Sequence, residues 1–234
     1  MKKVFFSTLL MMSAVIASAQ ISRPHFVSIN AGTNIPLADY KEVEDIEIGS
    51  AETGLSYSFE GGAYFSKLFG IGMHLGVFEN GVNEDDIRDL QNTIDNGTSV
   101  EDLSVSADKW VNGFFMIGPY MSFGGEKVIV DLKFLGGFLN TSKPSINIQN
   151  INNLDRISEE VSSTAFGFNY GLHFRIKLVN KLGLRISAEG FQSTQEFETR
   201  VREIDGNGNT VNVDREIEKE INSLNLGIGA IITF

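Results

Sequence analysis

The feature that most constrains this chain is the regular alternation of side chains in its segment 222–234. Every second residue is apolar, and the residues between them are small or polar apart from Ile231. A period of two predicts a β-strand, because successive side chains of a strand point to opposite faces. A soluble sheet can show this alternation too. A strand of this length that ends on an aromatic residue, here Phe234, fits better as the closing strand of a transmembrane barrel.

The same alternation recurs along the chain and predicts seven further strands. We place them at residues 25–34, 53–66, 70–78, 109–123, 128–139, 164–178 and 183–193. The segment 164–178 is the most regular of these, because its apolar face alternates with a face that contains His, Arg and Lys. The segment 109–123 contains Pro119, which cannot donate to a neighbouring strand, so we expect a bulge or a pause in pairing there.

The connections between these predicted strands alternate in length. Long polar connections are predicted at 37–52, 79–108, 140–163 and 194–222, and short ones at 66–69, 124–127 and 179–182. Such alternation is typical of an up-and-down barrel with short periplasmic turns and long extracellular loops. Within the second long connection, Ile87, Leu90 and Ile94 lie three and four residues apart, so the segment 83–94 could form a short helix.

The first residues have the pattern of a secretory signal peptide. Lys2 and Lys3 precede an apolar stretch, and small residues follow at 17–19. An N-terminal membrane anchor is the alternative, but the apolar stretch is short for a span of about 20 residues. We therefore predict a cleaved signal peptide at 1–19 and a single barrel domain at 20–234, with no second domain.

The composition excludes several classes of function. The chain has no cysteine, so neither a disulfide nor a thiolate metal site is available. A formal net charge of −11 at pH 7 argues against nucleic acid as a partner, because nucleic acids are bound by basic patches. After the signal peptide, no apolar run reaches the roughly 20 residues that a transmembrane helix needs.

In its alternating strands, its terminal aromatic residue and its connection lengths, the chain resembles the small outer-membrane β-barrels of Gram-negative bacteria, of the OmpA/OmpX type. The resemblance covers residues 20–234 and rests on this pattern. It implies an all-β fold, a transmembrane eight-stranded antiparallel up-and-down β-barrel in the cell outer membrane. It also implies a monomer that contacts outer-membrane lipid and lipopolysaccharide, with Phe234 as part of the insertion signal read by the barrel-assembly machinery.

The predicted strands direct a set of ionisable side chains into the barrel. These are Glu60, Asp131, Lys133, His173, Arg175, Lys177, Arg185 and Glu189. An eight-stranded barrel is just wide enough for side chains to fill, and charges inside it must pair or stay hydrated. We expect Arg175 or Arg185 to pair with Glu189, and Glu60 and Asp131 to pair with Lys133, Arg175 or Lys177. The favoured interpretation is a salt-bridge network that plugs the barrel, and a polar pore is the alternative.

No catalytic, cofactor or metal site is predicted. None of the three histidines, His25, His74 and His173, lies beside a Ser/Asp constellation, so structural histidines are favoured over a lipid-modifying enzyme. The segment 205–216 places oxygen-bearing side chains as in a calcium loop. Thr210 nevertheless replaces the glycine that such a loop requires, and we favour a hairpin tip.

The long connections contain most of the carboxylates, and a solvated, self-repelling surface is the default interpretation of such charge. We therefore predict a structural or interaction role through acidic extracellular loops, with an extracellular partner that the sequence does not identify. These loops could bridge to lipopolysaccharide phosphates through divalent cations or adhere to a basic partner. A narrow porin-like channel for small solutes is the alternative function.

Overall fold

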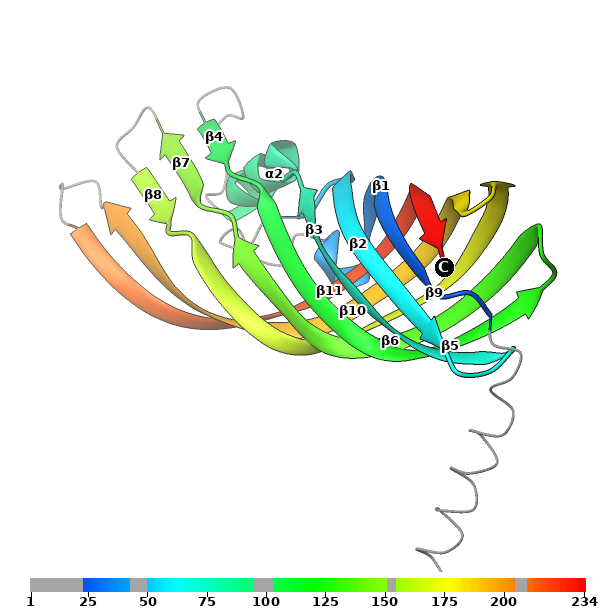
Figure 1. Cartoon of the computed structure of the whole chain (residues 1–234). Helices are drawn as coiled ribbons and strands as arrows, with labels where there is room; N and C mark the ends of the chain where they lie inside the picture. Colours follow the sequence, from blue (N-terminus) through cyan, green and yellow to red (C-terminus); the bar gives the residue numbers. More distant parts are fainter. Residues whose placement is uncertain (1–22, 43–49, 95–102, 151–154, 205–209) are drawn as a thin grey trace, which may run out of the picture.

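The computed structural model describes residues 23–42, 50–94, 103–150, 155–204 and 210–234, and these residues form an antiparallel β-barrel (Figure 1). Within this described part, eight long strands pair side by side into a ring, and the last strand pairs with the first. They are β1 (Phe26–Leu37), β2 (Gly54–Tyr64), β3 (Phe69–Asn80), β5 (Trp110–Gly124), β6 (Val128–Lys143), β9 (Val161–Val179), β10 (Leu182–Ile204) and β11 (Thr210–Thr233). The eight predicted strands are confirmed.

The ring is closed by pairing between β1 and β11. Their register runs from Phe26 opposite Thr233 to Leu37 opposite Asn222. Beyond it, His25 and Phe234 exchange both backbone hydrogen bonds, at 2.9 and 3.0 Å. Closure leaves no strand edge inside the bilayer, where no water is available to satisfy free backbone groups.

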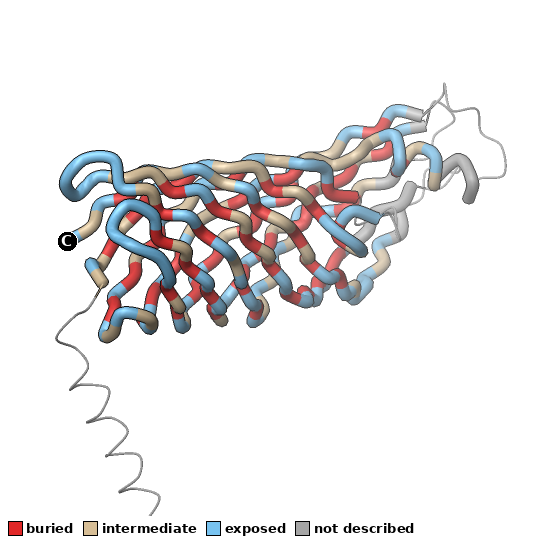
Figure 2. The backbone as a smooth tube through the Cα atoms, turned by 90° about the vertical axis from the view of Figure 1, so that its right-hand side faces the viewer, coloured by how far each residue is buried: buried red, intermediate tan, exposed pale blue. Residues whose placement is uncertain are grey.

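The two faces of the barrel wall differ as the alternation predicts. Buried and exposed residues alternate along the strands (Figure 2), because every second side chain points outward. Each ring strand contributes exposed apolar side chains to the outer surface, for example Ile29, Tyr57, Leu75, Phe115, Phe138, Phe168, Ile186 and Ile228. An apolar belt that surrounds a closed barrel is the surface that lipid covers.

Pro119 interrupts pairing without shifting it. β5 and β6 pair up to Ile117 opposite Gly136 and resume at Tyr120 opposite Lys133, with the same register on both sides. On its other side, Pro119 still lies opposite Ile71 of β3. The expected irregularity is therefore a pause in the ladder and not a bulge.

On the extracellular side, two of the predicted long loops contain strands that extend the sheet. These are β4 (Leu103–Ala107), β7 (Ile146–Asn150) and β8 (Asp155–Ser158), which add to β10 in the order β10-β8-β7-β4. The prediction of polar loops throughout 79–108 and 140–163 is thus wrong in part. So is the predicted loop at 194–222, because β10 continues to Ile204 and β11 begins at Thr210. A small apolar cluster of Ile87, Val105, Ile146 and Ile148 provides the burial that makes these strands form.

Helical structure is limited to the extracellular connections of the described chain. The predicted helix is confirmed as α2 (Glu84–Ile94), which contributes Ile87 to the cluster above, and a short 3-10 helix, η2 (Ala38–Tyr40), follows β1. No described helix is long and apolar enough to cross a membrane. The predicted signal peptide at 1–19 and the first positions of the segment 205–216 lie outside the described residues.

Candidate functional site: a charge network inside the barrel

The middle of the barrel contains a cluster of ionisable side chains from six strands, β2, β3, β5, β6, β9 and β10. Lys133 lies between two carboxylates, because its Nζ is 3.1 Å from Glu60 Oε2 and 3.2 Å from Glu189 Oε2. Arg185 Nη2 contacts the other oxygen of Glu60, and Tyr120 of β5 donates its hydroxyl to the same oxygen. We call the following set the central network: Glu60, His74, Tyr120, Lys133, His173, Arg185 and Glu189.

The two histidines of the central network contact its charged side chains. His173 Nε2 is 2.9 Å from Glu189 Oε1, and its Nδ1 is 2.5 Å from Arg185 Nη2. Because arginine only donates, Nδ1 must accept and Nε2 must carry the proton. His74 Nδ1 lies 3.0 Å from Lys133 Nζ and 3.2 Å from Asn169 Oδ1. A cationic side chain beside each ring favours the neutral imidazole in both residues.

With both histidines neutral, the charges of the central network sum to zero. Two carboxylates, Glu60 and Glu189, face two cations, Lys133 and Arg185. All four side chains are at most 4% exposed. Removing ions from water is unfavourable unless each finds a counter-charge and further hydrogen bonds. The balance and the dense contacts explain how this charge is tolerated inside a barrel.

A second ion pair lies nearer the periplasmic end. Arg175 of β9 makes a two-point contact with Asp131 of β6, with Nε 2.5 Å from Oδ2 and Nη2 2.7 Å from Oδ1. Tyr64 donates to Asp131 Oδ1 at 3.1 Å, and the guanidinium carbon of Arg175 is 4.6 Å from the ring centroid of Phe26. The Nη2 contact is a charge-assisted hydrogen bond, which is stronger than one between neutral groups.

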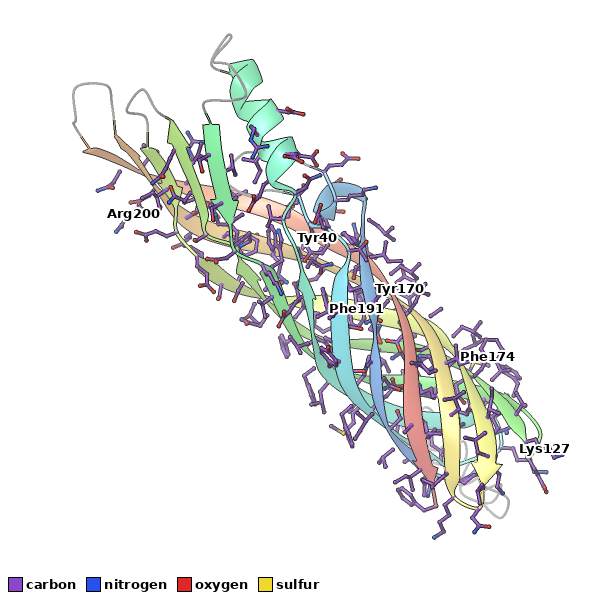
Figure 3. All side chains as sticks on the ribbon, turned by 90° about the horizontal axis from the view of Figure 1, so that it is seen from above. Tyr40, Lys127, Tyr170, Phe174, Phe191 and Arg200 are labelled. Atoms are coloured by element: carbon purple, nitrogen blue, oxygen red, sulfur yellow. The ribbon has the colours of Figure 1, made fainter. Side chains whose placement is uncertain are left out.

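Aromatic side chains fill the interior on the extracellular side of the central network. Phe114 packs against His74 with ring centroids 4.7 Å apart, and against Phe191 at 4.8 Å. Farther out, Trp110 packs edge-on to Tyr40 at 5.5 Å; Figure 3 labels Phe191 and Tyr40 along this path. Burial raises the pKa of Tyr40, so its hydroxyl stays neutral and donates to Asn80. The interior is thus filled in successive layers.

The structure places seven of the eight predicted interior residues inside the barrel, and Lys177 is the exception. Its side chain is exposed at the periplasmic end. The register between β9 and β10 shifts at Leu182 and Gly183, beside Lys177, and the strand leaves the filled interior there. Lys177 nevertheless keeps the inward phase of Arg175, two residues earlier, and lines the open periplasmic mouth of the barrel.

The expected pairing of Glu189 with an arginine is also wrong. Arg185 contacts Glu60, Arg175 contacts Asp131, and Glu189 contacts Lys133 and His173. Arg185 and Glu189 share β10, where residues four apart are separated by about 13 Å. Glu60 does pair with Lys133, as one of its expected partners.

Sequence reasoning missed several interior residues. Tyr120 follows Pro119 in the least regular predicted strand, so alternation gave no clear assignment. Lys143 and Lys219 are buried but lie beyond the predicted ends of their strands. Lys143 Nζ donates to Ser158 Oγ at 2.6 Å, and Lys219 Nζ donates to the carbonyl of Glu42 at 2.9 Å. Only the correct strand length would have revealed these two cations.

Histidines and carboxylates are also the residue types that act as catalytic bases and metal ligands. His25 Nδ1 accepts the backbone N–H of Tyr64 at 3.0 Å, and the other two histidines belong to the central network. Potential ligand atoms of Glu60, His173 and Glu189 lie within 4.8 Å of one another. A cation there would have to compete with Lys133 and Arg185 for the same carboxylates. The arrangement is therefore better suited to internal ion pairing than to metal binding.

No protein-family model and no curated protein sequence matches this chain. Solved structures similar to it include Neisserial surface protein A, at 13% identity over 92% of this chain and 100% of that chain, with a TM-score of 0.45. A major outer membrane protein from Thermus thermophilus matches at 14% identity over 91% and 100%, with a TM-score of 0.48. The outer membrane protease OmpT from Escherichia coli matches at 8% identity over 92% and 98%, with a TM-score of 0.48.

At these identities the likeness concerns the fold alone, and the residues of the chain itself define what it is. Its described strands form a closed antiparallel ring, and apolar side chains cover the outer wall. These two properties are those of barrels that cross a membrane, and the alternation of short turns with long loops is typical of outer-membrane barrels. The chain is an eight-stranded β-barrel protein of the outer membrane.

Proposed function

We propose that this protein is a closed, non-conducting barrel that presents an extracellular surface for interactions. The central network is the observation that supports this function most directly. Its side chains bridge the lumen from β2, β6 and β10 with direct contacts between side chains. The aromatic layers continue the filling towards the extracellular side. An ion path would require water-filled space that these contacts occupy.

The extracellular surface offers charge for such interactions. On the outer face of the β10–β11 hairpin, Glu196 lies directly opposite Glu218, and Glu198 lies opposite Glu216. All four side chains are exposed. Like charges directly opposite each other in a sheet destabilise it, so this arrangement serves stability poorly. It supports a role in contacts with a basic partner or with cations that bridge to lipopolysaccharide.

Conductance measurements in planar bilayers test the closed barrel. The folded protein is first identified by gel mobility with and without boiling, and the same sample is then added to the bilayer. We expect a heat-modifiable band and no stable unitary openings. Openings whose ion selectivity changes in Glu189→Gln would contradict the proposal and support the narrow channel. The separate variant Glu126→Gln, which changes an exposed residue of a periplasmic turn, is the matched control.

We also propose that Phe234 contributes to recognition by the barrel-assembly machinery. Its side chain is 59% exposed on the lipid-facing side, and its ring lies 6.1 Å from that of His25. Phe234→Ala should slow assembly in cells while leaving the stability of the folded barrel nearly unchanged. Phe69→Ala, which removes another exposed aromatic ring near the periplasmic end, is the control. Equal assembly rates for both variants would contradict this role.

A further inference from the structure

The periplasmic mouth of the barrel contains a cavity of about 490 Å³. It lies among the three short periplasmic turns, at the end of the molecule where Figure 3 labels Lys127. The buried side chains of Ile129 and Ile231 form part of its wall. It is separate from the central network and from the acidic extracellular surface, so neither accounts for it.

Among the charged side chains that line this cavity, cations outnumber carboxylates. The cations are Arg23, Lys67, Lys127, Arg175 and Lys177, whereas Glu126 is the one carboxylate among the lining residues. Within the described chain, Arg23 and the three lysines form no ion pair. Asp131 neutralises Arg175. The cavity therefore concentrates positive charge in a protein whose net charge is −11.

Two of these cations are held in position. The side chain of Arg23 bridges two turns, because its Nε donates to the carbonyl of Lys67 at 2.5 Å and its Nη2 to that of Gly124 at 3.1 Å. Arg175 is only 3% exposed, and its position is fixed by Asp131. Long cationic side chains normally lose much conformational entropy on binding, and this fixation has removed part of that cost in advance.

Arg175 also has a hydrogen-bond donor without an acceptor. Its Nη1 makes no hydrogen bond within the described residues, although the side chain is buried in the cavity wall. Buried donors in proteins are almost always paired. The guanidinium of Arg175 lies against the rings of Phe26 and Tyr64 and Nη1 has no exposed surface, so Arg175 shapes the cavity wall but offers no hydrogen bond to a bound group.

We propose that this cavity binds a phosphate group, with Arg23 as the hydrogen-bond donor and Lys67, Lys127 and Lys177 as surrounding charge. Planar guanidinium groups match the oxygens of a phosphate, and ammonium groups add attraction without strict geometry. Two sources share this chemistry: the headgroup of a phospholipid in the periplasmic leaflet, and free phosphate.

The apolar part of the lining favours the lipid as the source. Leu182 and Ile176 line the cavity as well, and Leu182 is 56% exposed on the lipid-facing wall. The cavity thus borders the apolar belt at the depth of lipid headgroups. A phospholipid could place its phosphate among the cations while its acyl chains stay in the bilayer.

The test uses the folded full barrel in zwitterionic micelles or in nanodiscs. Inorganic phosphate is titrated against chloride at equal ionic strength, and the side-chain Nε–H signal of Arg23 is followed by NMR. In parallel, nanodiscs with phosphatidylglycerol are compared with nanodiscs with phosphatidylcholine, and lipid that stays bound after extraction is measured by mass spectrometry. Saturable shifts with inorganic phosphate alone would identify free phosphate. Retention of phosphatidylglycerol would identify the lipid.

The triple variant Lys67→Gln, Lys127→Gln and Lys177→Gln should weaken either kind of binding at least tenfold. Its lysines are exposed, so the heat-modifiable band should be unchanged. Lys109→Gln is the control, since Lys109 is an exposed lysine that pairs with Glu79 at 3.5 Å at the other end of β5. The proposal is overturned if neither probe shifts the Arg23 signal, or if the triple variant and the control bind equally.

Discussion

The membrane-spanning part of this barrel and its extracellular extension differ in strand pairing and in charge balance, although β10 and β11 run through both. In the spanning part, every ring strand pairs on both sides and the interior charges balance. In the extension, residues 210–221 of β11 pair only with β10 among the described strands. There, glutamates face one another across the hairpin. The same two strands thus carry balanced charge at one end and unbalanced charge at the other.

The surroundings explain this difference. In hydrocarbon, an unpaired backbone group or charge has no water to solvate it, so pairing must be complete. In water, a free strand edge and a pair of like charges are less destabilising than in hydrocarbon, because solvent screens and hydrates them. The comparison teaches that the environment of a strand, more than its sequence neighbours, decides which charge patterns it can contain.

Glu60→Gln should have the largest effect, because it removes a buried charge that contacts both Arg185 and Lys133. Breaking a buried ion pair from one side typically costs about 3–5 kcal/mol. The free energy of unfolding in urea, followed by the fluorescence of the buried Trp110, should fall by that amount. Glu126→Gln should leave it unchanged. A loss below about 0.5 kcal/mol in Glu60→Gln would place the variant among ordinary surface substitutions and contradict a stabilising network.

Asp131→Asn should have a smaller effect. It leaves Arg175 without its counter-charge, but Arg175 lies in the wall of the periplasmic cavity, so water can hydrate the guanidinium once the pair is broken. Loss of the pair should therefore cost about 1–3 kcal/mol, as for a buried polar group left partly satisfied. The same unfolding measurement checks this value. A loss equal to that of Glu60→Gln would show that the two layers are equally isolated from water.

Glu218→Lys should have the smallest effect and the opposite sign. It replaces a like-charged pair with an attraction between Glu196 and the new lysine, and cross-strand pairs contribute about 0.2–1 kcal/mol. Amide hydrogen exchange should slow in the β10–β11 hairpin above the membrane and stay unchanged in the ring. Glu220→Lys, which faces the uncharged Thr194, is the matched control. Slower exchange throughout the barrel would show that the two regions are not independent.

The ring was predictable because the membrane imposes a simple pattern. A strand with lipid outside and a packed polar interior must alternate apolar and polar side chains, as 164–178 does. The short turns interrupt that alternation and mark the ends of the strands. The extension was not predictable in the same way. Ile146 and Ile148 alternate over one short segment only, and their burial depends on Ile87 of a distant helix. Such a pattern is too short to stand out from a polar loop.

The candidate site was predictable in its members but not in its pairs. Alternation identifies which residues face the interior, so Glu60, Lys133 and Arg185 could be named from the sequence. Partners across the lumen depend on the stagger between strands that are not neighbours. Arg185 and Glu60 illustrate this point, because they come from β10 and β2, and no local rule relates those two strands.

The partners in the central network lie far apart along the chain, and this separation affects how fast the barrel unfolds and folds. Glu60 and Lys133 are 73 residues apart, and Arg185 comes from a still later strand. Their charges stay uncompensated until β2, β6 and β10 are all in place around the lumen. A half-open barrel in lipid is therefore a high-energy species. We expect the lifetime of the barrel in the membrane to be set by this barrier, a kinetic property, more than by its equilibrium stability.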